Sequence, residues 1–184
     1  MRPAEHELRQ QLEGMDLVRL QQQRGWCYSS PQRFVLVHGV WSAPHPVPPG
    51  MWEGRPRCCF DNAIHVAILY DLPYIEGYAL LGLGETAIAL HHAWNLDPQG
   101  RVIDVTWRPT LGLAYVGVPF SPERADEATW EFDGTILEDY KRRYPLLREP
   151  WQGEAPDRVW PASPRLSTIR RRKRRLLPPE VTHG

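Results

Sequence analysis

Three residue types that together can form a nucleophilic site follow one another along the chain: a thiol, an imidazole and a carboxylate. Cys59 lies in RCCFDNAI, His92 in HHAWNLD and Asp104 in RVIDVTW. In thiol enzymes the cysteine attacks a carbonyl carbon, the histidine acts as general base, and the carboxylate orients the histidine ring. These residues in this order predict a cysteine-dependent enzyme, provided that the fold brings the three side chains together.

The segment from residue 58 to about residue 70 has the pattern of a helix with Cys59 at its start. Small side chains recur every four positions, at Cys59, Ala63 and Ala67, and Pro73 stops the helix. The unpaired N–H groups of a first helical turn, together with the helix dipole, favour a thiolate at Cys59. The backbone N–H of Cys59 is also a candidate oxyanion donor.

Strand alternation predicts how the two adjacent histidines differ. In the strand-like run 88–97, His92 shares its face with Trp94 and other apolar side chains. His91 shares the opposite face with Asn95 and another polar side chain. We therefore expect His92 to pack against the core and His91 to lie on a solvent-facing surface.

The turn at residues 97–100 (DPQG) sets the register of the next strand. Proline at its second position and glycine at its fourth favour a type I turn, in which Gly100 takes a positive φ as a G1 bulge. This loop pairs Trp94 with Asp104 and makes Asp104 the diagonal neighbour of His92 on the same face. Diagonal Cα atoms lie roughly 7–8 Å apart, which allows a His–Asp hydrogen bond. A two-residue loop would place Asp104 on the opposite face.

The strings CFDNA, YIEGYA, HAWN and DVTW, which fall between residues 34 and 120, carry a family resemblance. A Cys that opens a helix, a His in an HAW strand and an Asp in the next strand resemble the transglutaminase-like branch of the papain-like superfamily. The strings are also similar to those of small bacterial and phage proteins of this type. The resemblance implies a nucleophile at a helix start packed on an antiparallel sheet, with Cys59 as nucleophile, His92 as base and Asp104 as orienter.

The chemistry that the resemblance implies is attack on an amide, peptide or isopeptide carbonyl through a thioester. Hydrolysis of an unknown peptide, protein or small amide substrate is the first expectation, as in a thiol protease, amidase or deamidase. Transglutaminase-type transfer of the acyl group to an amine is the enzymatic alternative. A non-catalytic binding module that uses the same cleft is the alternative from another class, and the intact Cys, His and Asp argue against it. No cofactor is expected.

Three further residues are candidates for substrate binding or for the oxyanion. Asn62 lies three residues after Cys59 and either donates to an oxyanion or anchors a neighbouring loop, with anchoring favoured. Glu76 is either an exposed glutamate on a wet face or a carboxylate at the rim that binds substrate or pairs with an arginine. Trp94 is the third candidate, although its apolar face predicts a place in the core.

The other cysteines receive weaker interpretations. We expect Cys58 to be a core residue or a bystander and Cys27 to be structural. A metal site built from Cys58, Cys59, His91 and His92 is disfavoured, because adjacent residues seldom both bind one zinc ion and no CxxC or HxxxH spacing occurs.

Charge is distributed unevenly over a chain whose formal net charge is zero. Residues 165–184 hold seven basic residues and one acid, so residues 1–164 carry 15 basic and 21 acidic residues, a net charge of −6. The basic tail is a candidate contact for an acidic partner or for nucleic acid. No apolar run approaches the ~18 residues of a membrane span, and residues 1–24 lack the apolar region of a signal peptide. We expect a cytoplasmic location.

The succession of helices and then antiparallel strands predicts an α+β fold rather than a doubly wound sheet. We expect an N-terminal helix (1–25), a thiol-enzyme domain (26–150) and a proline-rich, basic, flexible tail (151–184). The expected elements are a helix at 4–24, a strand at 34–40, strands at 74–81, 88–97, 101–107 and 114–120, and a stretch at 127–144 that is first irregular and then helical.

Overall fold

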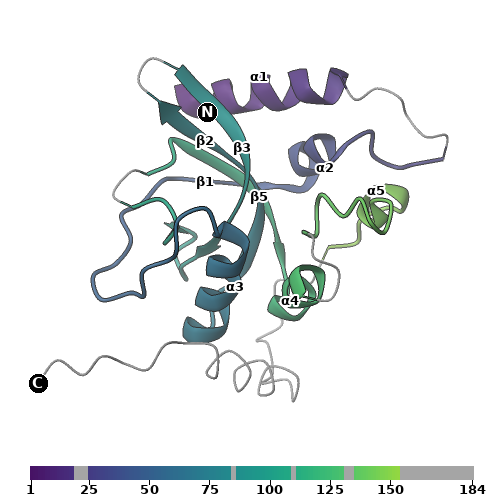
Figure 1. Ribbon diagram of the computed structural model, residues 1–184. Coiled ribbons are helices and arrows are strands. Elements are labelled where there is room, and N and C mark those ends of the chain that lie inside the picture. The colour runs from purple at the N-terminus through teal and green to yellow at the C-terminus, as the bar shows by residue number, and fades with distance from the viewer. Residues whose placement is uncertain (19–24, 84–85, 109–110, 131–134, 154–184) are drawn as a thin grey trace, which may run out of the picture. The chain divides into compact units, whose positions relative to one another are not determined.

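A computed structural model of the chain describes residues 1–18, 25–83, 86–108, 111–130 and 135–153. All described elements belong to one unit, residues 1–154, and the predicted tail from residue 154 onward lies outside the described residues. The fold is α+β, as predicted (Figure 1). The described helices are α1 (Pro3–Val18), α2 (Pro31–His38), α3 (Cys59–Tyr70), α4 (Pro122–Trp130) and α5 (Pro145–Arg148).

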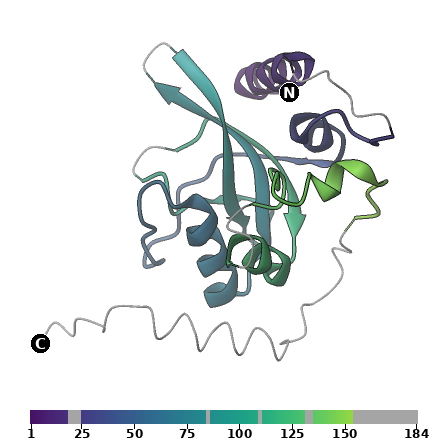
Figure 2. The same cartoon turned by 45° about the vertical axis from the view of Figure 1, so that its right-hand side comes forward.

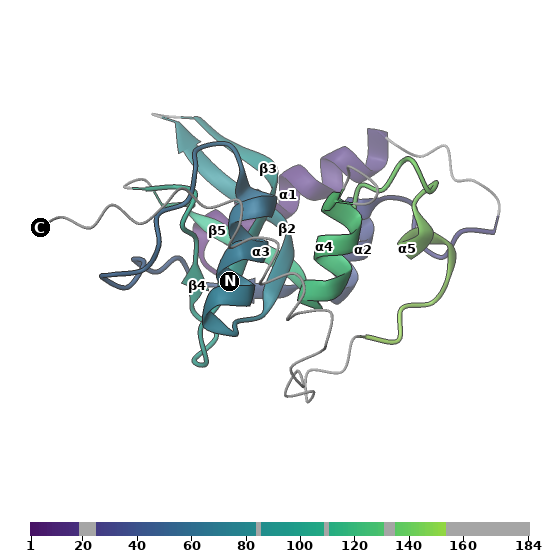
Figure 3. The ribbon, with the colours of Figure 1, turned by 60° about the horizontal axis from the view of Figure 1, so that its bottom comes forward.

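A curled antiparallel sheet forms the centre of this unit. The order of its strands is β1-β5-β2-β3-β4, and the long β2–β3 pair twists across it (Figure 2). Helices α3 and α4 lie side by side (Figure 3). The strands are β1 (Val40–Ser42), β2 (Tyr74–Leu83), β3 (Thr86–Leu96), β4 (Val102–Ile103) and β5 (Ala114–Phe120).

Helix α3 packs against the face of β2 and β3 that was predicted to be wet. Asn95 on this face donates a hydrogen bond of 3.0 Å to the backbone carbonyl of Ala63 in α3. The prediction of a solvent-facing polar surface is therefore wrong, because α3 and the segment around residues 136–137 cover it. The buried side chains on this face include Tyr74, Glu76, Tyr78, Ala93 and Asn95.

The segment 31–38 forms helix α2, so the prediction of a strand over residues 34–40 is wrong for all but its last residue. Ser30 caps the helix, since its hydroxyl accepts a hydrogen bond of 2.9 Å from the N–H of Arg33. Pro31 occupies the first helical turn, where its missing N–H costs nothing. Phe34 and Val35 are fully buried, so the run of β-branched and aromatic residues reflects burial in a short helix rather than a strand.

Other predicted elements differ from the structure mainly at their ends, except that the strand expected at 101–107 is shortened to β4 (Val102–Ile103). The strand at 114–120 is confirmed as β5, and the predicted N-terminal helix extends over Pro3–Val18, with residues 19–24 outside the described part. The predicted irregular and then helical stretch at 127–144 is wrong in order, because α4 occupies Pro122–Trp130. None of the helices in the described ranges is long and apolar enough to span a membrane.

Helix α1 is fastened to strand β3 by the side chain of Gln11. Its Nε2 donates to the carbonyl of Ala87 at 2.9 Å, and its Oε1 accepts from the N–H of Ala89 at 2.8 Å. The amide group therefore makes the two hydrogen bonds that a peptide unit of a neighbouring strand would make. On the helix itself, Leu8 and Leu12 are fully buried.

Candidate active site

Helix α3 begins at Cys59, as the sequence pattern predicts. Cys58 is the N-cap residue, and its carbonyl accepts the first helical hydrogen bond from the N–H of Asn62 at 2.8 Å. Both cysteines are partly buried, whereas Cys27 is exposed and its thiol donates to the carbonyl of Arg148 at 3.4 Å. Of the three thiols, Cys59 is the one that starts a helix.

The hairpin that follows has the predicted bulge and register. Gly100 has a φ of +74°, and its N–H donates to the carbonyl of Asp97 at 2.9 Å, which closes the turn. Leu96 pairs with Val102. The next pair, Asn95 with Ile103, is the last one between these two strands. The side chain of Asp104 nevertheless lies on the face of His92, as the bulge predicts.

His92 and Asp104 form a buried hydrogen bond, with 2.8 Å between Nε2 of the ring and Oδ2 of the carboxylate. The side chain of Cys59 also lies close enough to the ring to raise the pKa of His92, and since Asp104 occupies Nε2, we infer that Cys59 faces Nδ1. Only the start of α3 reaches His92, because the body of the helix packs on the opposite face of β3. In the described part of the chain, β3 pairs at His92 with β2 alone. The other edge of β3 is therefore open at this position, and the start of α3 can approach the ring there.

The environment of His92 favours its protonated form. Burial alone lowers the pKa of His92, but the hydrogen bonds and charges of Asp104 and Cys59 outweigh burial and raise the pKa to about 9. The indole of Trp107 stacks on the imidazole with 3.9 Å between ring centroids and 12° between planes. At neutral pH the ring is therefore an imidazolium, held flat between its partners.

Asp104 is held by donors from several directions. Its Oδ1 accepts from the backbone N–H groups of Thr106 at 2.9 Å and Trp107 at 3.3 Å, and its Oδ2 accepts from the Tyr115 hydroxyl at 3.0 Å as well as from His92. Burial raises the pKa of Asp104, but the hydrogen bond and charge of His92 and the other donors lower it below its usual value. Asp104 therefore remains a carboxylate that cannot turn away from the ring.

The other predicted site residues serve the framework. Asn62 is fully buried, and its amide donates to the carbonyl of Arg55 at 2.7 Å and to the hydroxyl of Thr106 at 3.0 Å. Both amide hydrogens are used, so Asn62 anchors the preceding loop, the interpretation favoured from the sequence. Trp94 is 1% exposed and packs edge-on against Tyr115, with 5.1 Å between ring centroids, so it lies in the core.

Glu76 lies neither on a wet face nor at a rim, so both interpretations drawn from the sequence are wrong. Its side chain is fully buried, and its carboxylate accepts from Nε2 of His91 at 3.0 Å, from the Tyr74 hydroxyl at 2.9 Å, and from the N–H groups of Ile136 at 3.1 Å and Leu137 at 2.7 Å. Burial raises the pKa of Glu76, but His91 and the other donors lower it. Glu76 thus fastens the segment after α4 to the sheet.

Two residues contribute to the site in ways that the sequence did not predict. Tyr115 reaches Asp104 from β5, which β2 and β3 separate from β4 in the sheet although β5 is the next strand in sequence. The alternation of β5 could place Tyr115 on a buried face, but it could not tell which strand β5 pairs with. Trp107 packs against the core cluster that holds Trp94 and Tyr115, and its indole also stacks on His92, a contact that the sequence did not predict.

A groove of about 790 Å³ lies between the loop that precedes α3 and the residues that follow Asp104. Its walls therefore come from the two segments that lead directly to Cys59 and away from Asp104. Arg108 in this groove is 29% exposed and lies 3.8 Å from the carboxylate of Glu53, which is 84% exposed. The other lining residues include Val47, Pro56, Val105, Thr106 and Leu111.

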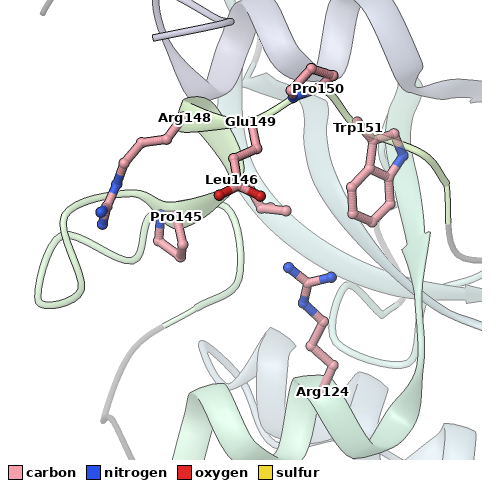
Figure 4. Close-up of a pocket in the computed structure, with 7 residues that line it drawn as sticks. All are labelled: Arg124, Pro145, Leu146, Arg148, Glu149, Pro150 and Trp151. Atoms are coloured by element: carbon pink, nitrogen blue, oxygen red, sulfur yellow. The ribbon is translucent and has the colours of Figure 1, made fainter. Parts of the chain in front are cut away.

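A second pocket, of about 290 Å³, lies between α4 and the segment around α5 (Figure 4). Arg124 points into it from α4, with its guanidinium 5.5 Å from the ring centroids of both Phe120 and Trp151. None of the residues that line it belongs to the Cys59 site.

Within the described ranges, no three His, Cys, Asp or Glu side chains gather as a metal site would require. Comparisons with protein-family models, with curated proteins and with solved structures find no match to this chain.

Proposed function

We propose that this protein is a cysteine-dependent hydrolase that cleaves an amide, peptide or isopeptide bond through a thioester, with the papain-like or transglutaminase-like arrangement of Cys, His and Asp. One observation carries the proposal: a single imidazole ring shares a hydrogen bond of 2.8 Å with Asp104 and lies close enough to Cys59 for that side chain to raise its pKa. Such a line of thiol, imidazole and carboxylate is the arrangement that nucleophilic catalysis by cysteine requires.

In the first step, Cys59 Sγ attacks the carbonyl carbon of the substrate as a thiolate. The C=O π electrons move to oxygen, and the backbone N–H of Cys59, in the first turn of α3, is a donor for the oxyanion. The tetrahedral intermediate then breaks its C–N bond. His92, which is protonated at neutral pH, gives its Nδ1 proton to the departing amine and becomes neutral.

In the second step, neutral His92 removes a proton from water, and the resulting hydroxide attacks the thioester carbon. The C–S bond breaks, the acyl group leaves as a carboxylic acid, and the thiolate and imidazolium are restored. Asp104 stays ionised throughout, since its hydrogen bonds favour the carboxylate. Its task is to keep Nε2 of the ring protonated and Nδ1 directed at the thiol and the substrate.

The groove beside the site is a suitable place for the acyl donor. Its volume of about 790 Å³ accommodates several residues of an extended chain, and its lining combines apolar side chains such as Val105 and Leu111 with the charged Arg108. Val105 and Thr106, which follow Asp104 in the chain, line the groove, whereas Cys59, His92 and Asp104 do not.

Covalent labelling tests the proposal. The protein is treated with iodoacetamide at pH 6 and, separately, with an activated ester of a small acyl amino acid, and adducts are located by peptide mass spectrometry. We expect both adducts on Cys59, with the acyl adduct decaying in water. Cys58→Ala, the matched neighbouring variant, should label normally, whereas Cys59→Ala should lose both adducts. Dominant labelling of Cys58, or an acyl adduct that forms and decays in His92→Gln as fast as in the wild type, contradicts the proposed function.

A further inference from the structure

Asp104 shares one carboxylate oxygen between two side chains. Oδ2 accepts from Nε2 of His92 at 2.8 Å and from the hydroxyl of Tyr115 at 3.0 Å. Tyr115 is fully buried, so this hydrogen bond has no competition from solvent. The phenol thus acts directly on the oxygen that controls His92.

The direction of the Tyr115 hydroxyl proton is fixed by a second hydrogen bond. The backbone N–H of Gly112 donates to the Tyr115 oxygen at 3.0 Å, so the hydroxyl accepts from Gly112 and donates to Asp104. A Cβ at position 112 would lie 2.6 Å from the phenol oxygen, which explains why a glycine stands there. Leu111, the residue before it, lines the groove. A chain of contacts therefore runs from the groove wall through Gly112 and Tyr115 to the carboxylate.

We propose that Tyr115 is a positioning residue of the triad: its hydroxyl restrains the basicity of Asp104 and thereby sets how firmly His92 holds its proton. The inference rests on the proposed function in that Asp104 and His92 are taken to serve Cys59. It goes further by assigning a fourth side chain, from β5, to the control of the proton that the leaving amine must receive.

Few charged or titratable groups surround His92, so the direction in which its pKa should change without the phenol can be stated. Cys59 faces the ring from the start of α3, Asp104 from the residues after β4, and Tyr115 from β5, while the residue opposite His92 on β2 is Gly77. Without the phenol, the negative charge on Oδ2 is less dispersed and attracts the imidazolium more strongly. The backbone N–H groups of Thr106 and Trp107 still hold Oδ1 in place.

The test is the pKa of His92, measured by NMR titration of the resting protein, in Tyr115→Phe. The matched control is Tyr74→Phe, because Tyr74 is also buried and also donates to a buried carboxylate, that of Glu76. We expect the pKa of His92 to rise by about one unit in Tyr115→Phe, the scale of one hydrogen bond to a carboxylate, and to stay unchanged in Tyr74→Phe. An unchanged or lowered pKa in Tyr115→Phe overturns the inference, because a merely structural tyrosine would alter stability alone.

A second variant guards against failure of Tyr115→Phe to fold. A fluorinated tyrosine at position 115 keeps the ring and makes the hydroxyl a stronger donor, so the pKa of His92 should fall, and a rise or no change overturns the inference. Both measurements need no substrate. If Cys59 is not labelled but the pKa of His92 moves as expected, the proposed function fails and the inference stands. If Cys59 is labelled but the pKa of His92 does not move as expected, the proposed function stands and the inference fails.

Discussion

Replacing Glu76 by glutamine keeps the shape of a buried side chain but removes its charge and one acceptor oxygen. The wild-type carboxylate accepts four hydrogen bonds, two at each oxygen. At each oxygen one donor is a side chain and the other is a backbone N–H, that of Ile136 or of Leu137. The two backbone groups are buried with their residues, which are at most 3% exposed.

The loss of stability in Glu76→Gln depends on which of the four donors can become an acceptor for the new NH₂ group. The Tyr74 hydroxyl can rotate and His91 can change tautomer, but a backbone N–H cannot become an acceptor. Whichever way the new amide is turned, its NH₂ group therefore faces one backbone N–H and leaves it without a partner. A buried donor without a partner costs ~1–3 kcal/mol, and loss of the charged bond to His91 adds about 1 kcal/mol, so we expect a destabilisation of roughly 3 kcal/mol.

Urea denaturation measures this loss, with Glu138→Gln as the matched control. Glu138 also lies near His91, at 3.7 Å, but its side chain is 33% exposed, so its substitution should cost less than ~1 kcal/mol. The reasoning is refuted if the two variants lose equal stability, or if Glu76→Gln unfolds at the wild-type urea concentration.

Three further outcomes are expected. Asp104→Asn should lower the pKa of His92 from about 9 to below 6.5, because the charge of Asp104 no longer counteracts the effect of burial. The wild type should therefore lose stability as the pH rises from 6.5 through about 9, whereas the variant should not, and thermal melts across this range measure the difference. Gly77→Ala should prevent folding or cost more than ~3 kcal/mol, since its Cβ would lie 2.2 Å from a backbone oxygen, whereas Gly82→Ala meets only a flexible leucine side chain at 3.0 Å and should be mild by the same melts. Deleting residues 165–184, which lie outside the described residues, should leave the melting temperature unchanged, and any tail-dependent binding should weaken as salt rises; binding that survives high salt contradicts the electrostatic interpretation.

Features governed by local chemistry were predictable from the sequence. The start of α3 at Cys59 and the bulge at Gly100 each depend on a few consecutive residues, and the bulge alone decides which face carries Asp104. The His92–Asp104 pair could therefore be predicted without knowing the rest of the sheet.

Features that depend on distant segments were not predictable in the same way. Glu76 looked solvent-exposed because it shares its strand face with Tyr74 and Tyr78, but the segment at 136–137 supplies two N–H groups that make burial of the charge possible. Phe34 and Val35 suggested a strand by propensity, yet the cap at Ser30 starts a helix there. In both cases tertiary contacts or a short capping signal outweighed the residue pattern.

The hydrogen bonds of the Gln11 amide bear on whether two molecules of this protein can associate through the edge of β3. In the described part of the chain, β4 pairs with only two residues of β3, so much of β3 is an edge strand whose backbone groups could pair with a strand of a second molecule. Gln11 occupies two of these groups, at Ala87 and Ala89, and α1 stands in the path of an approaching strand. We therefore expect that removal of α1 would leave these backbone groups of β3 free to pair with a strand of a second molecule.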